Sequence, residues 1–398
     1  MATSITIEAS KSARALTLSA YASFVPIGIA TVLLGPMLPT LSARWSLNYA
    51  QAGALFNAQY LASTLAVALS GVLVARRGYR FAMKSGLLLA ATGVALLLSG
   101  SKVLGIACIA ANGAGLGLSV PAANLLAAEV NPGRRSAVLN VLNFCWSVGA
   151  VSCPFLVAIA AKRQHITLFL ALVAGFMFLV VVGIAAMPST VVEPTVAKNT
   201  TGKKSLGIDW KHPALLPLAA LFLIYVGTEN GFGLWLASYA KSLGSLTPTM
   251  SLMTPSFFYA ALTVGRWVAP FALRRIDEVR WAQAGLVVSC LGMGGLLISR
   301  DLPGVSLSTC LAGLGISSVY PITIALLSRE FGASASRVGS LMFTLSNVGG
   351  GVLPWVVGMS SNRFGTLKAG LAVPLIGSAA MLLLYFRDWK ADAAREAA

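Results

Sequence analysis

Charged residues are scarce in this chain of 398 residues, where they make up only 10% of the sequence. A soluble globular protein carries about 25% charged residues, so water cannot be the main solvent of this chain. Hydrophobic residues account for 57%, and the mean hydropathy is +0.81. The composition therefore excludes an ordinary soluble domain and predicts a protein that lies mostly within lipid.

Residues that hold metals or perform covalent chemistry are also few. The five cysteines fall within apolar stretches, at spacings that suit neither a zinc site nor a disulfide framework. The two histidines are far apart, and no loop carries the glycine-rich phosphate cradle of ATP-driven proteins. The apolar stretches also lack a nucleophile with a neighbouring base. We therefore expect no enzymatic activity, no cofactor and no metal site, and the short loops exclude a sensor with a soluble output domain.

Long apolar runs occupy most of the chain. A helix needs roughly 20 apolar residues to cross the hydrocarbon core of a bilayer. The runs are continuous and do not alternate as barrel strands do, so we predict an all-α polytopic membrane protein. Twelve transmembrane helices are expected, at Leu16–Pro39, Gln51–Val74, Ala82–Gly100, Val103–Leu126, Ala137–Ala160, Ile166–Met187, Leu215–Ala240, Met253–Leu273, Trp281–Ile298, Val305–Leu327, Val338–Met359 and Leu367–Phe386.

The net charge of +17 reports membrane topology. If the amino terminus is cytoplasmic, twenty of the 29 lysines and arginines fall on the cytoplasmic side and eight on the other. This bias follows the positive-inside rule and places both termini in the cytoplasm. We therefore expect no nucleic-acid partner. The basic composition and the absence of a cleavable signal sequence suit the cell inner membrane.

Two stretches 200 residues apart read as copies of each other. Val148–Pro154 returns as Val348–Pro354, and the glycine run Gly115–Ser119 returns as Gly313–Ser317, at an offset of 198. The repeat predicts two pseudo-symmetric six-helix bundles, residues 1–187 and 213–398, joined by a polar cytoplasmic linker, residues 188–212. Parallel repeats of this kind place a cavity between the halves near the bilayer midplane, as in alternating-access carriers.

The loop after the second expected helix resembles a known signature. Gly71, Arg76, Gly78 and Arg80 stand at positions of the G-x-x-x-D-R-x-G-R loop of the major facilitator superfamily, and Ala75 replaces the acidic residue. The resemblance extends over essentially the whole chain and implies the major facilitator fold. It also implies that these four residues form a loop that controls conformation.

A narrower resemblance involves the fourth, fifth, seventh and tenth expected helices. The patterns are similar to those of the fucose/glucose permease branch (fucose-galactose-glucose:proton symporters), and they implicate transport of a sugar. They comprise Gly115–Gly117, Ala122–Asn124, Leu139–Asn140, Asn143, Gly149–Ala150, Pro154, Tyr225–Gly231, Trp235, Tyr239 and Tyr320–Pro321. Proton-coupled members carry acidic residues in the first and fourth helices, and this chain has none there.

Two charged side chains lie well inside the expected helices, Glu229 and Arg266. A charge at the centre of a membrane helix costs roughly 2.5–3.5 kcal/mol on insertion scales, so such residues are candidates for function. We predict that Glu229 is the coupling or substrate-binding carboxylate and that Arg266 sets its protonation. The alternatives are a purely structural ion pair, or an arginine that extends to the cytoplasmic edge.

Neutral polar and aromatic residues within the expected helices indicate the substrate class. Carboxamides both donate and accept hydrogen bonds, which suits the hydroxyls of a sugar, and aromatic faces cover the C–H face of a pyranose. Each carboxamide has an alternative role as a hydrogen bond between helices. The candidate substrate-binding residues are Gln59, Tyr60, Asn112, Asn124, Asn143, Trp146, Asn230, Trp235, Tyr259 and Asn347.

The sequence therefore predicts a secondary active or facilitative transporter of a small neutral solute, which we expect to be a sugar. The two bundles would rock about a central site, with H+ or Na+ as the coupling ion if transport is coupled. The alternative is an efflux antiporter for hydrophobic compounds, suggested by the aromatic residues and by a loose likeness of Gly149–Pro154 to an antiporter motif. We expect the carrier to work as a monomer.

Overall fold

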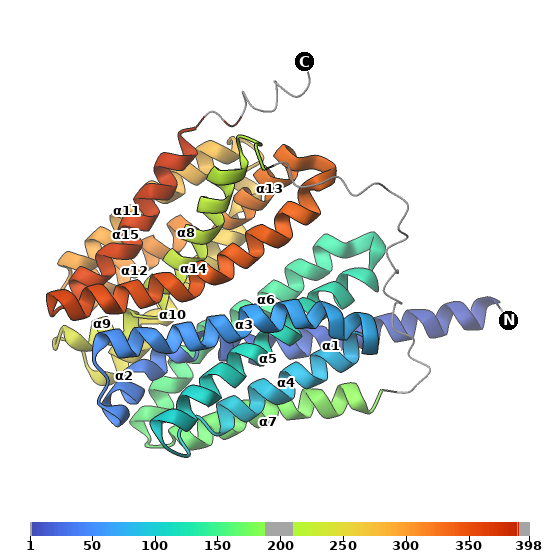
Figure 1. Ribbon diagram of the computed structural model, residues 1–398, viewed down its shortest axis with the longest axis horizontal. Helices are drawn as coiled ribbons and strands as arrows, with labels where there is room; N and C mark the ends of the chain where they lie inside the picture. The colour runs from blue at the N-terminus through green and yellow to red at the C-terminus, as the bar shows by residue number, and fades with distance from the viewer. Residues whose placement is uncertain (1, 188–209, 388, 390–398) are drawn as a thin grey trace. The chain divides into compact units, whose positions relative to one another are not determined.

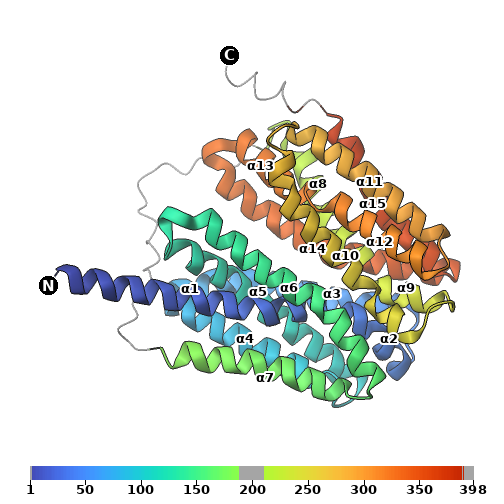
Figure 2. The same cartoon turned by 180° about the vertical axis from the view of Figure 1, so that it is seen from behind.

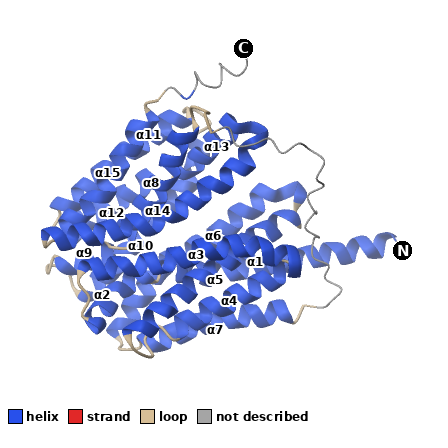
Figure 3. Ribbon diagram, in the orientation of Figure 1, coloured by secondary structure: helices blue, strands red, loops and turns tan. Residues whose placement is uncertain are grey.

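The computed structural model describes residues 2–187, 210–387 and 389, and its described elements are helices joined by short loops (Figure 3). Most of the expected linker, residues 188–209, lies outside the described residues. The α-helices are α1 (Ala2–Val32), α2 (Leu34–Trp45), α3 (Tyr49–Arg77), α4 (Tyr79–Ala95), α5 (Lys102–Glu129), α6 (Arg135–Lys162), α7 (Ile166–Ala185), α8 (Leu215–Gly233), α9 (Leu236–Ser242), α10 (Pro248–Ala272), α11 (Glu278–Ile298), α12 (Leu302–Ile316), α13 (Val319–Phe331), α14 (Ala335–Phe364) and α15 (Leu367–Tyr385). Short 3-10 helices, η1 (Pro132–Arg134) and η2 (Gly332–Ser334), precede α6 and α14.

The twelve expected membrane helices correspond to these elements, but three of them are interrupted. The first is divided into α1 and α2 at Leu33, the seventh into α8 and α9, and the tenth into α12 and α13 at Ser317 and Ser318. Among the described residues, ten segments are long and apolar enough to span a membrane. The 17-residue α4 and the proline-containing α10 are not among the ten. The composition and these helices confirm an all-α polytopic membrane protein.

The chain forms two compact units. The first comprises residues 1–34 and 58–200, and the second comprises residues 35–57 and 201–398. In the first unit, α1 packs along α6, and α4 contacts both α5 and α7 (Figure 1). The second unit repeats this pattern with α8 along α14 and with α11 against α12 and α15, as the reverse view also shows (Figure 2). Bundles bounded at residues 187 and 213 remain a prediction.

Residues 35–57 pack within the second unit through the start of α3. The indole of Trp235 lies against the rings of Tyr49 and Phe56, with centroids 6.5 and 5.9 Å apart. A side chain added at Gly53 would lie 3.2 Å from the Cα atom of Trp355, so α3 and α14 approach closely there. Such contacts depend on glycine because membrane helices associate mainly through close packing.

The glycines establish the register of the internal repeat. A Cβ atom at Gly113 would meet the Gln59 carbonyl of α3, and one at Gly313 would meet the Phe258 carbonyl of α10, the corresponding helix of the second half. The pairs Gly115 and Gly315, and Gly149 and Gly349, likewise contact corresponding helices in their own halves, namely α4 and α11, and α1 and α8. The offset is therefore 200 residues throughout, and the offset of 198 expected for the first glycine run was wrong. Positions in the two halves are equivalent when their glycines contact corresponding helices, even where the neighbouring sequence letters match better at another offset.

Candidate functional site

Three of the predicted site residues converge on the end of α1. The helix ends at Val32, so its last four carbonyls lack intrahelical donors. The side-chain amide of Asn112 donates to the Ala30 carbonyl at 3.1 Å, and that of Gln59 donates to the Thr31 carbonyl at 3.3 Å. The indole N–H of Trp146 donates to the Thr31 hydroxyl at 3.4 Å. Side chains from α3 and α5 therefore provide donors for two carbonyls at the end of the interrupted first helix, and α6 adds a bond to the Thr31 side chain.

A small cavity lies beside this cluster, entirely within the first unit. Its volume of about 10 Å³ is close to the minimum that holds one water molecule. The Oδ1 atom of Asn112 is buried without a hydrogen-bond partner, and Asn112 and Gln59 are only 7% and 4% exposed. In this conformation the two carboxamides border a space too small for a sugar ring. The cavity is lined by Leu33, Leu34, Gln59, Gly93, Val94, Leu97, Cys108, Ile109 and Asn112.

The remaining predicted site residues of the first unit are more accessible. Tyr60 and Asn124 are half-buried, and Asn143 is exposed. The amides of Asn124 and Asn143 donate to carbonyls one turn earlier in their own helices, each at 2.9 Å. Both retain a side-chain oxygen and a second N–H for other partners.

The loop signature shapes the junction between α3 and α4. Gly78 adopts a φ of 81°, a left-handed conformation that favours glycine, and this allows the chain to turn between the two helices. Arg80 donates to the Ile184 carbonyl at 2.8 Å and to the Met187 carbonyl at 3.0 Å, so it caps the carboxyl end of α7. Gly71 and Arg76 lie exposed on α3. A conformational role for these residues remains a prediction.

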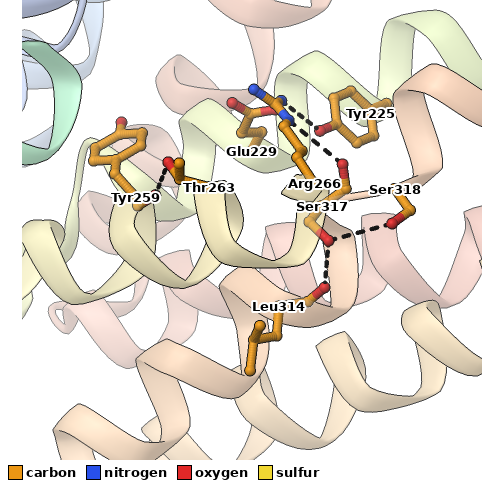
Figure 4. A network of polar contacts seen from close by, with 8 residues as sticks. All are labelled: Tyr225, Glu229, Tyr259, Thr263, Arg266, Leu314, Ser317 and Ser318. Atoms are coloured by element: carbon orange, nitrogen blue, oxygen red, sulfur yellow. Dashed lines mark hydrogen bonds and ion pairs between the residues drawn. The ribbon is translucent and has the colours of Figure 1, made fainter. Parts of the chain in front are cut away.

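The two charges predicted within membrane helices meet inside the second unit (Figure 4). An Nη atom of Arg266, on α10, lies 3.6 Å from a carboxylate oxygen of Glu229, on α8. The two side chains are 29% and 12% exposed, respectively. Arg266 also donates to the Tyr225 hydroxyl and to the Ser317 carbonyl, each at 3.4 Å. A separation of 3.6 Å is longer than the roughly 2.7–2.9 Å of a strong charge-assisted hydrogen bond, so the guanidinium is shared between Glu229 and these two neutral acceptors.

Aromatic rings extend from this ion pair across the second unit. Tyr225 stacks on Tyr320 with ring centroids 5.0 Å apart and planes 26° apart. Phe222 meets Tyr320 edge-on at 5.5 Å and Phe343 at 5.9 Å. Tyr225 and Phe222 are buried, whereas Tyr320 is half-buried and Phe343 is exposed. The accessible aromatic side chain beside the ion pair is therefore Tyr320 of α13, and Phe343 of α14 extends the aromatic group beyond Phe222.

The aromatic residues predicted as sugar ligands in this unit are buried instead. Trp235 is 1% exposed, and its indole N–H donates to the Pro354 carbonyl at 2.9 Å. Tyr259 is also buried, beside the ring of Phe258. Asn230 and Asn347 are half-buried on α8 and α14. A role of these four residues in substrate binding remains a prediction.

The sequence analysis did not select Tyr225, Ser317, Tyr320 or Phe343 as site residues. Two of them carried a detectable signal. Tyr225 lies four residues before Glu229 and therefore on the same helix face. Ser317 lies four residues before Pro321, which has no N–H to donate to the Ser317 carbonyl. Tyr320 was part of the resemblance to the sugar permeases, but its stacking on Tyr225 depends on helix packing, and Phe343 carried no signal.

Repeated helical bundles, an ion pair within membrane helices and polar side chains at helix breaks define a class, the multi-pass membrane transporters. The sequence profile of the Major Facilitator Superfamily matches residues 20–354. The chain belongs to this superfamily, whose members are transporters and not enzymes.

Two curated relatives have named functions. The "Glucose/galactose transporter" of Brucella abortus (strain 9-941) is 25% identical over 375 residues, which are 88% of this chain and 88% of the relative. The "Glucose/mannose transporter GlcP" of Bacillus subtilis (strain 168) is 30% identical over 144 residues, 35% of this chain and 34% of the relative. Among solved structures, a "D-xylose-proton symporter" superposes with a TM-score of 0.75 at 16% identity, over 94% of this chain and 97% of the other. These findings confirm the predicted fold and the resemblance to the sugar permeases.

Proposed function

We propose that this transporter carries a small neutral sugar, a hexose or a close relative, across the cell inner membrane. Two curated relatives named as glucose transporters support a sugar over the hydrophobic compounds of an efflux antiporter. The carrier would expose its site to one side of the membrane at a time, as repeated bundles of this kind do. Both termini would lie in the cytoplasm, and a monomer would be sufficient for transport.

The observation that carries this proposal is the Glu229–Arg266 pair beside the half-buried ring of Tyr320, which stacks on Tyr225. A carboxylate accepts hydrogen bonds from several sugar hydroxyls, and aromatic rings cover the apolar C–H face of a pyranose. The half-buried or exposed carboxamides Asn143, Asn230 and Asn347 are the best candidates for additional sugar ligands, because their polar atoms are not all enclosed.

Glu229 is also the proposed coupling residue. A carboxylate in a membrane helix can bind and release a proton, whereas an arginine stays charged at any physiological pH. The ion pair therefore has one member that can change its charge during transport. The "D-xylose-proton symporter" of the same fold supports a proton over sodium as the coupling ion.

Counterflow in liposomes tests the proposal. Purified protein is reconstituted, and exchange of a labelled hexose panel is measured at several pH values, with and without sodium. Uptake driven by an imposed pH gradient is measured in parallel. The variants are Glu229→Gln, which mimics a protonated carboxyl, and Glu278→Gln, a matched control at an exposed carboxylate at the start of α11.

We expect the wild type and Glu278→Gln to exchange a hexose and to accumulate it along the pH gradient. Glu229→Gln should retain exchange and lose accumulation, because a permanently neutral side chain cannot release a proton. Loss of both activities would make Glu229 a sugar ligand rather than the coupling group. If no hexose exchanges under any condition, the sugar proposal is refuted, and an assay with hydrophobic cations would test efflux.

A further inference from the structure

Arg266 has two neutral oxygen partners in addition to Glu229. The Tyr225 hydroxyl and the Ser317 carbonyl each accept a hydrogen bond from the guanidinium at 3.4 Å, both shorter than the 3.6 Å separation from Glu229 (Figure 4). These oxygens come from α8 and from the break between α12 and α13. The guanidinium would therefore keep two acceptors if Glu229 lost its charge.

The Ser317 carbonyl is available because of Pro321. In a continuous helix this carbonyl would accept a hydrogen bond from the N–H of residue 321, which proline lacks. Backbone hydrogen bonding resumes one residue later, where the Ile322 N–H donates to the Ser318 carbonyl at 3.1 Å. A buried carbonyl without a donor is costly, and Arg266 provides one through Nε. The proline thus turns a backbone oxygen into part of the site.

Close packing of α10 on this break fixes the position of Arg266. Its neighbour Gly265 is so near the break that a Cβ atom there would overlap the Ser317 side chain and lie 3.2 Å from the Leu314 carbonyl. Only glycine permits this approach. The backbone of Arg266 is therefore held at a constant distance from the carbonyl it contacts.

The side chain of Tyr225 is also fixed by its packing. Its side chain is 1% exposed, and its ring stacks on Tyr320. The hydroxyl accepts a hydrogen bond from Arg266, and Glu229 lies one turn further along α8. The guanidinium therefore has the Tyr225 hydroxyl as a neutral acceptor in addition to the Glu229 carboxylate.

We propose that Tyr225 and the Ser317 carbonyl form a neutral cradle that holds the Arg266 guanidinium while Glu229 carries a proton. The proton comes from the aqueous phase on one side, binds to the Glu229 carboxylate, and leaves to the other side. Arg266 stays charged throughout and transfers its hydrogen bonding from Glu229 to the cradle. Tyr225 and Pro321 are thus positioning residues for the coupling step. The transport part of this inference rests on the proposed function.

Few other charges influence this exchange. Tyr320 on α13 is the other titratable side chain close enough to interact with both Glu229 and Arg266. On the helices packed against α8, the other charged residues are Arg329 and Glu330 at the end of α13, Arg337 and Arg363 in the first and last turns of α14, and Lys368 in the first turn of α15. All of them lie near helix ends, whereas Gly227 of α8 contacts the middle of α14 at Gly349 and Leu353. The cradle therefore acts mainly on Glu229.

A double-mutant cycle on thermal stability tests the cradle without any transport assay. Tyr225→Phe removes the hydroxyl and keeps the stacked ring, and Glu229→Gln neutralises the carboxylate. Because Arg266 depends more on the cradle once Glu229 is neutral, Tyr225→Phe should lower the Tm more in the Glu229→Gln background than in the wild type. Tyr239→Phe is the matched control, since this buried hydroxyl of the second unit donates to the Leu296 carbonyl at 3.1 Å. Its effect should be the same in both backgrounds.

The pH profile of hexose uptake provides the second readout. Without the Tyr225 hydroxyl, the guanidinium relies more on ionised Glu229, so protonation should require a lower pH. The midpoint should move down by up to about one pH unit, which is the contribution expected of a single hydrogen bond. Pro321→Ala, which returns an N–H to the Ser317 carbonyl, should act in the same direction, and Tyr239→Phe should not move the midpoint.

The outcomes distinguish this inference from the proposed function. Equal Tm losses for Tyr225→Phe in both backgrounds would overturn the cradle, whatever the transport data show. Non-additive Tm losses with no hexose transport would retain the cradle and refute the sugar. Hexose transport with an unmoved midpoint in both Tyr225→Phe and Pro321→Ala would overturn its role in coupling. Tyr225→Phe is expected to fold, because the ring contacts remain.

Discussion

Neutralising either member of the ion pair should have different consequences, because only one member can lose its charge. Arg266→Gln leaves Glu229 ionised and only 12% exposed without its cation. Glu229→Gln leaves Arg266 with the Tyr225 hydroxyl, the Ser317 carbonyl and a new amide oxygen. We therefore predict that Arg266→Gln is the more destabilising change at pH 8.

The magnitude follows from the 3.6 Å separation. At an effective dielectric constant of about 20, Coulomb's law gives a gross attraction of about 4–5 kcal/mol. Desolvation of both groups offsets much of it, and the 29% exposure of Arg266 weakens it further. We therefore expect Arg266→Gln to lower the free energy of unfolding by about 2 kcal/mol at pH 8. Glu229→Gln should lower it by about 1 kcal/mol, because neutral acceptors retain part of the hydrogen bonding of Arg266. In a unit of roughly 200 residues, 2 kcal/mol corresponds to a Tm decrease of about 4–8 °C.

The pH dependence makes the prediction specific. In Arg266→Gln, the loss of stability comes from an ionised carboxylate that is buried without its cation, so protonation of the carboxylate removes this loss. The Tm deficit of Arg266→Gln should therefore be smaller at pH 5 than at pH 8. The Tm of Glu229→Gln itself should show no pH dependence from this pair, because its remaining charged member, Arg266, does not titrate.

Thermal unfolding of the detergent-solubilised protein, followed by tryptophan fluorescence, measures these shifts. The double variant Glu229→Gln/Arg266→Gln is the control and should lose the pH dependence seen in Arg266→Gln. An Arg266→Gln deficit of equal size at pH 5 and pH 8 would refute the reasoning. So would a deficit no larger than that of Glu229→Gln at pH 8.

Two further predictions concern packing and capping. Gly349→Ala should lower the Tm by several degrees or abolish folding, because its Cβ would overlap the Leu223 carbonyl. Gly294→Ala is the control and should be nearly neutral, because no atom lies within 4 Å of the added carbon. Fluorescence-detected size-exclusion thermostability measures both. Arg80→Gln should lower the stability of the folded protein by about 1–2 kcal/mol in the same assay, because it removes charged donors from the end of α7. An equal loss of stability in the neighbouring Arg77→Gln would contradict the capping role.

The helical spans and the class of protein could be predicted because they depend on patterns along the chain. Continuous apolar runs predict membrane helices whatever their neighbours are. The Glu229–Arg266 pair was also accessible to sequence analysis, because a charge inside such a run is costly and must find a partner. The repeat was recognisable, and its offset of 200 residues was correct at Val148–Pro154 but not at the first glycine run, whose letters also match at an offset of 198.

Other parts of the site could not be predicted because they depend on contacts between distant segments. The structure places Gln59 and Asn112 on free carbonyls at the end of α1. Their spacing along the chain does not reveal that the first helix stops at Val32. A carboxamide facing a sugar and one facing a broken helix look alike in sequence, since both are buried donors in an apolar run. Only the packing of α1 against its neighbours distinguishes the two roles.

The sequence by itself determined where the chain meets lipid, how often the fold repeats and which two side chains carry charge into the membrane, because hydropathy and charge are local properties. Only the tertiary structure decided what those charges contact. The Tyr225 hydroxyl, the Ser317 carbonyl freed by Pro321 and the close approach at Gly265 come from three separate segments. These segments come together at one guanidinium only because their helices pack against one another, and the sequence of any one segment does not specify its neighbours.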